Sequence, residues 1–273
     1  MNSKIALTTP VVSVKWLHDN MKASNLIILD GTINKSFNAS VEQIENTRLF
    51  EIKKKFSDIT NPFPSAFPSK EQFQKEAQVL GVNNDSVIVV YDDKGIYSSA
   101  RVWWLFKAFG FNNIAVLDGG FPQWKKAGYK TEHMHVYNGK LGDFKANLQT
   151  NYMHFFNDVK IASKNKTHKI IDARSAGRFN CTIPEPKEGL RMGTIPNSVN
   201  LPFTDLLENG VLKSKKDLAK AFYMVAEQDD PIIFSCGSGI TACVLALGAE
   251  ISGYKNISVY DGSWTEWGSL VRE

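Results

Sequence analysis

The chain has 273 residues, of which 43% are apolar and 22% charged, and its formal net charge is +4. These values are typical of a soluble globular protein with one large or two ordinary domains. No window approaches about 18 uninterrupted apolar residues, which argues against a membrane-spanning helix, and no basic run suggests a nucleic-acid partner. Residues 1–14 hold one lysine and no long apolar stretch, so we expect no secretory signal.

Elements of the first half follow in chain order. The apolar run Leu26–Ile28 ends at Asp30, and a second apolar run, Val87–Tyr91, ends at Asp92 with a glycine three residues later. The pattern over Ala100–Phe109 predicts a helix. A Leu-Asp-Gly-Gly turn around Asp118 comes next, shortly before a tryptophan.

The second half repeats this order. An apolar pair precedes Asp172, the strand-like run Ile232–Ser235 ends at Cys236, a helical pattern covers Ala242–Ile251, and a Tyr-Asp-Gly-Ser turn surrounds Asp261. Anchors in the two halves are offset by 142, 144 and 143 residues in the pairs Asp30 and Asp172, Asp92 and Cys236, and Asp118 and Asp261. We therefore predict two copies of one domain, 1–137 and 151–273, joined by a polar, glycine-containing linker at 138–150.

Strands that alternate with helices predict an α/β fold in which each copy is a mainly parallel sheet flanked by helices. Ligand sites in such sheets lie beyond the carboxyl ends of the strands, where both Asp92 and Cys236 fall. Because the first copy has an acid in place of the thiol, we expect Asp92 to be a structural or capping residue. We expect one active site, in the second copy, with the first copy forming a wall of its cleft.

Cys236 stands between a buried strand and a helix, in a tight loop that holds two glycines. Unpaired backbone N–H groups and the positive end of the helix dipole stabilise a thiolate there, so this cysteine is predicted to be a nucleophile rather than a packing residue. The chain has only two further cysteines, Cys181 and Cys243. For these we favour a bystander thiol and a packing residue, respectively. A total of three cysteines, which is small and cannot be fully paired, argues against a disulfide framework and for a reducing, cytoplasmic compartment.

These features resemble the rhodanese superfamily, specifically its tandem-domain sulfurtransferases, over nearly the whole chain. The sequence Cys-Gly-Ser-Gly-Ile-Thr at 236–241 is similar to the active loop of the 3-mercaptopyruvate sulfurtransferases. Further matches are Asp172-Ala173-Arg174, Gly177-Arg178-Phe179, Pro184-Glu185-Pro186, Ile195–Phe203 and Tyr97–Trp104. The resemblance implies transfer of sulfur from 3-mercaptopyruvate through a persulfide on Cys236 to a thiol such as thioredoxin, or to cyanide, with release of pyruvate. No nucleotide-binding glycine motif is present, and we expect neither a cofactor nor a metal.

The resemblance also assigns roles to single residues. Cys236 and Ser238 would be catalytic, and Arg178 and Lys187 would grip the substrate carboxylate. Tyr97 of the first copy would face the same cleft. The loop itself would bind substrate through Gly237, Gly239, Ile240 and Thr241.

The chain departs from the family pattern at several of these places. Lys187 stands where the family has a second arginine, which keeps the charge but loses the planar two-pronged geometry. The usual His-Ile-Pro-Gly of the second copy reads Thr-Ile-Pro-Asn at 194–197. Lys54 and Ser65 occupy the positions of an Asp and a His that would assist Ser238, so activation is expected to come mainly from the loop amides and the helix end.

Three alternatives stay open. Thiosulfate is a second candidate donor, although its enzymes typically carry basic residues where Gly237 and Ser238 stand. A Cys-based phosphatase or arsenate reductase needs an arginine six residues after the cysteine, and Ala242 stands there instead. A non-catalytic sulfur carrier is the third.

His133 and His135 have a spacing that suits a metal, but with no cysteine nearby we expect them to be solvated.

Overall fold

The computed structural model describes residues 3–272 and divides into two compact units. The first unit is Met1–Ile59, Phe67–Gln149 and Asn209–Val211, and the second is Thr60–Ala66, Thr150–Glu208 and Leu212–Glu273. Residues 138–149, which read as a linker, pack along the first unit. There Phe144 is buried and its carbonyl accepts a hydrogen bond from Gln78 at 2.9 Å.

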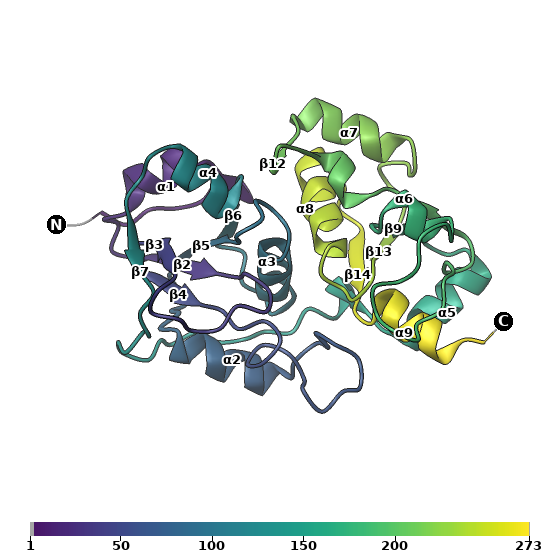
Figure 1. The fold of residues 1–273 in the computed structure, drawn as a ribbon, viewed down its shortest axis with the longest axis horizontal. Coiled ribbons are helices and arrows are strands. Elements are labelled where there is room, and N and C mark those ends of the chain that lie inside the picture. The colour runs from purple at the N-terminus through teal and green to yellow at the C-terminus, as the bar shows by residue number, and fades with distance from the viewer. Residues whose placement is uncertain (1–2, 273) are drawn as a thin grey trace. The chain divides into compact units, whose positions relative to one another are not determined.

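The first unit is built on a five-stranded, all-parallel sheet with the order β1-β6-β5-β2-β4 (Figure 1). Its strands are β1 (Val11–Val12), β2 (Leu26–Asp30), β4 (Thr47–Leu49), β5 (Val87–Tyr91) and β6 (Ile114–Leu117). Its helices are α1 (Val14–Asn20), α2 (Lys70–Val79), α3 (Ser99–Ala108) and α4 (Gly120–Lys126). Strands β3 (Glu42–Ile44) and β7 (Thr131–His133) form a separate antiparallel pair.

Helices cover both faces of this sheet. On one face, Leu17 of α1 and Trp124 of α4 pack against Ile28 and Val89 of the central strands. On the other face, aromatic rings from α2 and α3 pack against one another, for example Phe73 and Phe106, which meet edge to face at 5.0 Å between ring centroids. Because strands β2 and β5 are buried on both faces, they read as continuous apolar runs rather than as alternating patterns.

The second unit repeats this architecture with the parallel order β10-β9-β13-β14-β8. Its strands are β8 (Met153–His154), β9 (Lys169–Asp172), β10 (Ser198–Asn200), β13 (Ile232–Ser235) and β14 (Ile257–Tyr260), with a small pair β11 (Leu207–Glu208) and β12 (Val211–Leu212). Its helices are α5 (Phe156–Asn165), α6 (Ala176–Phe179), α7 (Lys215–Tyr223), α8 (Ala242–Ser252) and α9 (Ser263–Leu270), with 3₁₀ turns η1 (Thr150–Tyr152) and η2 (Phe203–Leu206).

The two sheets match strand by strand: β1, β6, β5, β2 and β4 correspond to β8, β14, β13, β9 and β10. The expected α/β fold of two tandem, mainly parallel domains is therefore confirmed. In each unit the strand before the repeated loop is central and wholly buried, β5 before Asp92 and β13 before Cys236. This position fixes the start of the loop against the core and aims it at the carboxyl edge of the sheet.

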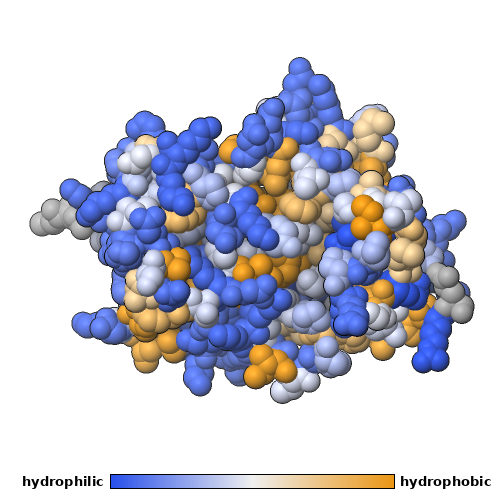
Figure 2. Space-filling view, viewed as in Figure 1, coloured by the Kyte–Doolittle hydropathy of each residue, from blue (hydrophilic) through white to orange (hydrophobic). Residues whose placement is uncertain are grey.

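Polar side chains cover most of the face shown in Figure 2, with scattered apolar ones between them. Within residues 3–272, no helix combines the length and the apolar character that crossing a membrane requires. Five tryptophans, Trp103, Trp104, Trp124, Trp264 and Trp267, are buried.

Candidate active site

Cys236 follows β13 directly and lies at the bottom of the loop that leads into α8. The residue is 2% exposed, whereas Gly237 and Ser238 after it are half-buried. Gly239 has a φ of +74°, and Gly95, its counterpart in the first copy, has a φ of +102°. Glycine is repeated at this position because the turn needs a left-handed backbone that other residues adopt only with strain.

The first copy shows what this loop does to a negative charge. The carboxylate of Asp92 is fully buried and accepts hydrogen bonds from the backbone N–H groups of Lys94, Tyr97 and Ser99 at 2.8–2.9 Å. The hydroxyl of Ser99 donates to it as well, at 2.6 Å. The loop is thus an anion cradle, and Asp92 has the structural, capping role expected of it.

In the second copy, a thiol replaces the carboxylate at the bottom of the same loop. By the repeat, the amides of Ser238 and Thr241 align with those of Lys94 and Tyr97. Backbone donors arranged in this way stabilise a thiolate, and the N-terminal end of α8 adds the positive end of its dipole. The geometry therefore supports a nucleophilic Cys236.

Helix α9 holds the outer side of the loop. The backbone N–H of Trp264 donates to the Cys236 carbonyl at 3.0 Å, and that of Thr265 donates to the Gly237 carbonyl at 2.9 Å. The Thr265 hydroxyl donates to the Gly237 carbonyl too, at 2.6 Å. The first carbonyls of the loop are thereby occupied on the side of α9.

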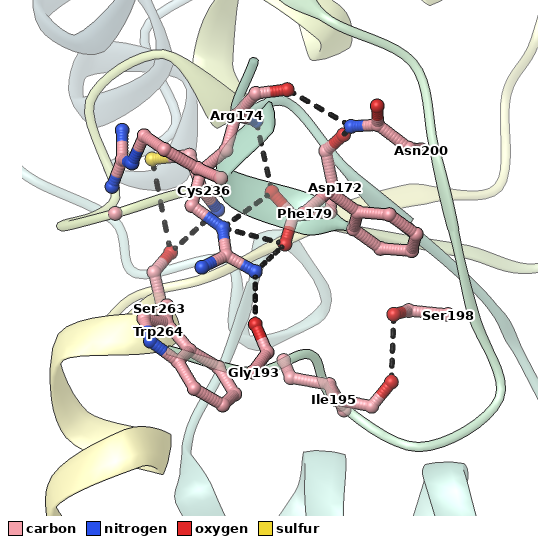
Figure 3. A network of polar contacts seen from close by, with 12 residues as sticks. Asp172, Arg174, Phe179, Gly193, Ile195, Ser198, Asn200, Cys236, Ser263 and Trp264 are labelled. Atoms are coloured by element: carbon pink, nitrogen blue, oxygen red, sulfur yellow. Dashed lines mark hydrogen bonds and ion pairs between the residues drawn. The ribbon is translucent and has the colours of Figure 1, made fainter. Parts of the chain in front are cut away.

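Ser263 contacts the nucleophilic residue directly (Figure 3). Its Oγ accepts a hydrogen bond from the Cys236 N–H at 3.0 Å, and the hydroxyl proton has two acceptors, the Tyr260 carbonyl at 2.9 Å and Cys236 Sγ at 3.9 Å. Ser263 adopts a φ of +50°, and Gly120, its counterpart in the first copy, a φ of +52°. The sequence analysis did not identify Ser263; the available signal was a serine where the other copy has glycine.

Arg178 on α6 lies beside the loop. A Cβ atom added to Gly237 would lie 2.9 Å from Arg178 Nη2, so a side chain at position 237 would crowd the guanidinium. Glu185 holds Arg178 in place, with Nη2–Oε2 at 2.5 Å and Nε–Oε1 at 3.3 Å. Arg178 remains 23% exposed, so it can meet a solute.

A second arginine lies buried behind this pair and binds the same glutamate. Arg174 donates to both carboxylate oxygens of Asp172 at 2.7–3.1 Å, to Glu185 at 2.7 Å and to the Gly193 carbonyl at 2.9 Å. Its guanidinium also lies 4.8 Å from the ring centroid of Trp264 (Figure 3). Burial lowers the pKa of Arg174, but the carboxylates outweigh burial and raise it, so Arg174 keeps its charge. Glu185 therefore links a rigid core to Arg178, a role that sequence reasoning did not find.

The remaining candidates are placed less centrally. Lys187 lies in the exposed segment after Glu185, while Ile240 and Thr241 are buried where the loop enters α8. Tyr97 belongs to the other unit, where its N–H caps Asp92 and its ring lies 4.6 Å from Lys94 Nζ.

Lys54 and Ser65 occupy the positions at which the family has the Asp and the His of a proton relay. Lys54 is exposed and pairs with Glu51 at 3.4 Å, and Ser65 is buried with a φ of +61°. All three cysteines are free. Cys181 is exposed, and Cys243 is fully buried with its thiol donating to the Gly239 carbonyl at 3.4 Å. Between residues 3 and 272, no group of three or more His, Cys, Asp or Glu side chains is placed to hold a metal ion.

Two segments of the chain, 13–127 and 157–270, match the family model of the rhodanese-like domain. The chain belongs to the rhodanese family. The two matched segments agree with the two structural repeats, and each contains one of the aligned loops that start at Asp92 and Cys236.

Relatives that are similar over nearly the whole chain include proteins named sulfurtransferases. The chain is 36% identical to the mitochondrial thiosulfate/3-mercaptopyruvate sulfurtransferase 1 of Arabidopsis thaliana, over 97% of this chain and 77% of that protein. It is 34% identical to the 3-mercaptopyruvate sulfurtransferase of Homo sapiens, over 96% of this chain and 92% of that protein. The crystal structure of the 3-mercaptopyruvate sulfotransferase SseA from Escherichia coli superposes with a TM-score of 0.83 at 33% identity, over 94% of this chain and 99% of that one.

Proposed function

We propose that this rhodanese is a sulfurtransferase that takes sulfur from 3-mercaptopyruvate and passes it, through a persulfide on Cys236, to a thiol acceptor such as thioredoxin. The observation that carries the proposal is a thiol at the bottom of a loop whose counterpart binds a carboxylate through three backbone N–H groups. Relatives named 3-mercaptopyruvate sulfurtransferase, similar over nearly the whole chain, support the choice of donor.

The reaction has two balanced steps. The Cys236 thiolate attacks the sulfur of 3-mercaptopyruvate, an S–S bond forms and the C–S bond breaks. Its electron pair leaves with the carbon as the enolate of pyruvate, which takes up a proton. An acceptor thiolate then attacks the outer sulfur of the persulfide and returns Cys236 as a thiolate. Loop amides stabilise the Cys236 thiolate at the start of the first step and at the end of the second.

Arg178 supplies the charge that orients the donor. Glu185 occupies its Nε and Nη2, so the Nη1 side is the one we assign to the substrate carboxylate. Ser238, half-buried on the loop, is the group we assign to proton transfer near the enolate. Tyr97 remains a proposed substrate contact from the first copy, and Lys187 a second, weaker one.

Thiosulfate is the alternative donor, and the names of some relatives include it. Gly237 and Ser238 leave the loop neutral, so nothing on it pairs with the sulfonate end of thiosulfate. We expect kcat/KM to be at least about tenfold higher with 3-mercaptopyruvate than with thiosulfate, because this ratio measures discrimination between donors. A higher ratio for thiosulfate would reverse the assignment of the donor and leave the chemistry of Cys236 intact.

The proposal is tested by steady-state turnover with reduced thioredoxin. Wild-type protein should release pyruvate over many turnovers, Cys236→Ser should release none, and Cys181→Ser, which removes an exposed thiol, should match wild type. A single burst without turnover would instead indicate a sulfur carrier. Pyruvate release by Cys236→Ser would refute the role of this cysteine.

A further inference from the structure

We infer that Thr265 is a positioning residue for the active loop. Its hydroxyl holds the Gly237–Ser238 peptide so that the Ser238 N–H faces the Cys236 sulfur. This inference rests on the proposed function of Cys236 and adds a residue of α9 that touches neither substrate nor sulfur. Thr265 donates twice to one atom, the Gly237 carbonyl oxygen, through its N–H at 2.9 Å and its hydroxyl at 2.6 Å.

Peptide geometry connects this carbonyl to the cradle. A trans peptide is planar, so its C=O and the following N–H point in opposite directions. Fixing the Gly237 carbonyl toward α9 therefore turns the Ser238 N–H toward the inside of the loop. Gly237 gives little resistance to a flip of this peptide, because glycine tolerates most backbone conformations. The two donors of Thr265 replace that missing restraint.

In the first copy, a different interaction holds the corresponding peptide. There the amide aligned with Ser238 is that of Lys94, and it donates to the Asp92 carboxylate at 2.9 Å. The Asp92 carboxylate thus orients the loop from within. The residue aligned with Thr265 is Pro122, which has neither a backbone N–H nor a hydroxyl. In the first copy the Asp92 side chain orders the loop from within, whereas in the second copy, which has no carboxylate at this position, α9 orders it from outside.

The test compares three variants at position 265. Thr265→Val keeps the shape and the backbone N–H but loses the hydroxyl, Thr265→Ser keeps the hydroxyl, and Thr265→Ala is the substitute should the valine variant misfold. Ser252→Ala is the matched control, because it removes a hydroxyl bonded to a backbone carbonyl at 2.8 Å on α8 of the same unit. The readouts are the pH profile of Cys236 alkylation by iodoacetamide and the first-turnover rate of pyruvate release.

For Thr265→Val we expect the midpoint of the alkylation profile to rise by about 0.5 to 1 pH unit, because one hydrogen bond to the thiolate is weakened. We expect the first-turnover rate to fall about three- to tenfold. Thr265→Ser and Ser252→Ala should keep the wild-type midpoint. If wild type forms a persulfide and Thr265→Val or Thr265→Ala keeps both its midpoint and its rate, the inference about Thr265 is wrong while the proposed function stands. If wild type itself forms no persulfide, the proposed function fails.

Discussion

Ser263 combines a strained backbone with a hydroxyl at the nucleophile, so two substitutions separate strain from chemistry. Its φ of +50° lies in the left-handed region, where Gly120 provides a strain-free counterpart in the first copy. Ser263→Ala keeps the strain and loses the hydroxyl. Ser263→Gly loses the hydroxyl but relieves the strain.

The magnitudes follow from the contacts. Either substitution leaves the buried Cys236 N–H without the acceptor it has at 3.0 Å, which costs about 1–3 kcal/mol of unfolding free energy. Glycine regains about 1–2 kcal/mol of left-handed strain but loses about 0.5–1 kcal/mol to the entropy of the unfolded chain. Ser263→Gly should therefore be more stable than Ser263→Ala by about 0.5–1 kcal/mol, or about 1–4 °C in melting temperature.

Activity should depend on whether the Ser263 hydroxyl is present, and not on the stability of the variant. Both variants lose the donor that lies 3.9 Å from Cys236 Sγ, so both should form persulfide about tenfold more slowly than wild type. Urea unfolding and single-turnover pyruvate release measure the two quantities. Lys166 has a φ of +54° at the end of α5, and its Gly and Ala variants should show the same order of stability at the wild-type rate. A Ser263→Ala variant more stable than Ser263→Gly would refute the strain argument, and a wild-type rate in either would refute the role of the hydroxyl.

Two further predictions concern Lys187 and His154. Lys187→Arg restores a two-pronged donor and should lower KM for 3-mercaptopyruvate with little change in kcat; an unchanged KM in steady-state kinetics would count against Lys187 as a carboxylate grip. Burial, and then His168, lower the pKa of His154 below 6.5, so the folded state favours its neutral form. The free energy of unfolding should therefore fall as pH drops below about 6.5, where the unfolded chain binds the proton more readily. His154→Asn should weaken this pH dependence in urea titrations at pH 7.5 and 5.5. An equally steep loss of stability in the variant would contradict the role of His154.

The elements around the loop could be read from the sequence because they are local. The run Val87–Tyr91 is strand β5, and the helix expected at Ala242–Ile251 is α8, one residue longer. Buried central strands and an apolar helix leave strong patterns of hydrophobicity. The order of strands within each sheet had no such signal, because it depends on pairings between segments far apart in the chain.

The site was predictable where the chemistry lies in one short segment, and not where it depends on contacts between segments. Cys236 and its loop form one continuous motif. Ser263 bonds to a residue 27 positions away, and Glu185 joins two arginines that lie 7 and 11 positions before it. Residues 138–149, which the glycines and polar residues predict to be a linker, are a further case, because the burial of Phe144 in the first unit depends on contacts between segments.

In the proposed reaction Cys236 carries the sulfur. Peptide mapping by mass spectrometry, after the protein has reacted with one equivalent of 3-mercaptopyruvate and been blocked with an alkylating agent, tests it most directly. One additional sulfur atom should appear on the peptide that contains Cys236, and none on that of Cys181. An additional sulfur on Cys181 alone, or on neither peptide while pyruvate is released, would contradict the account.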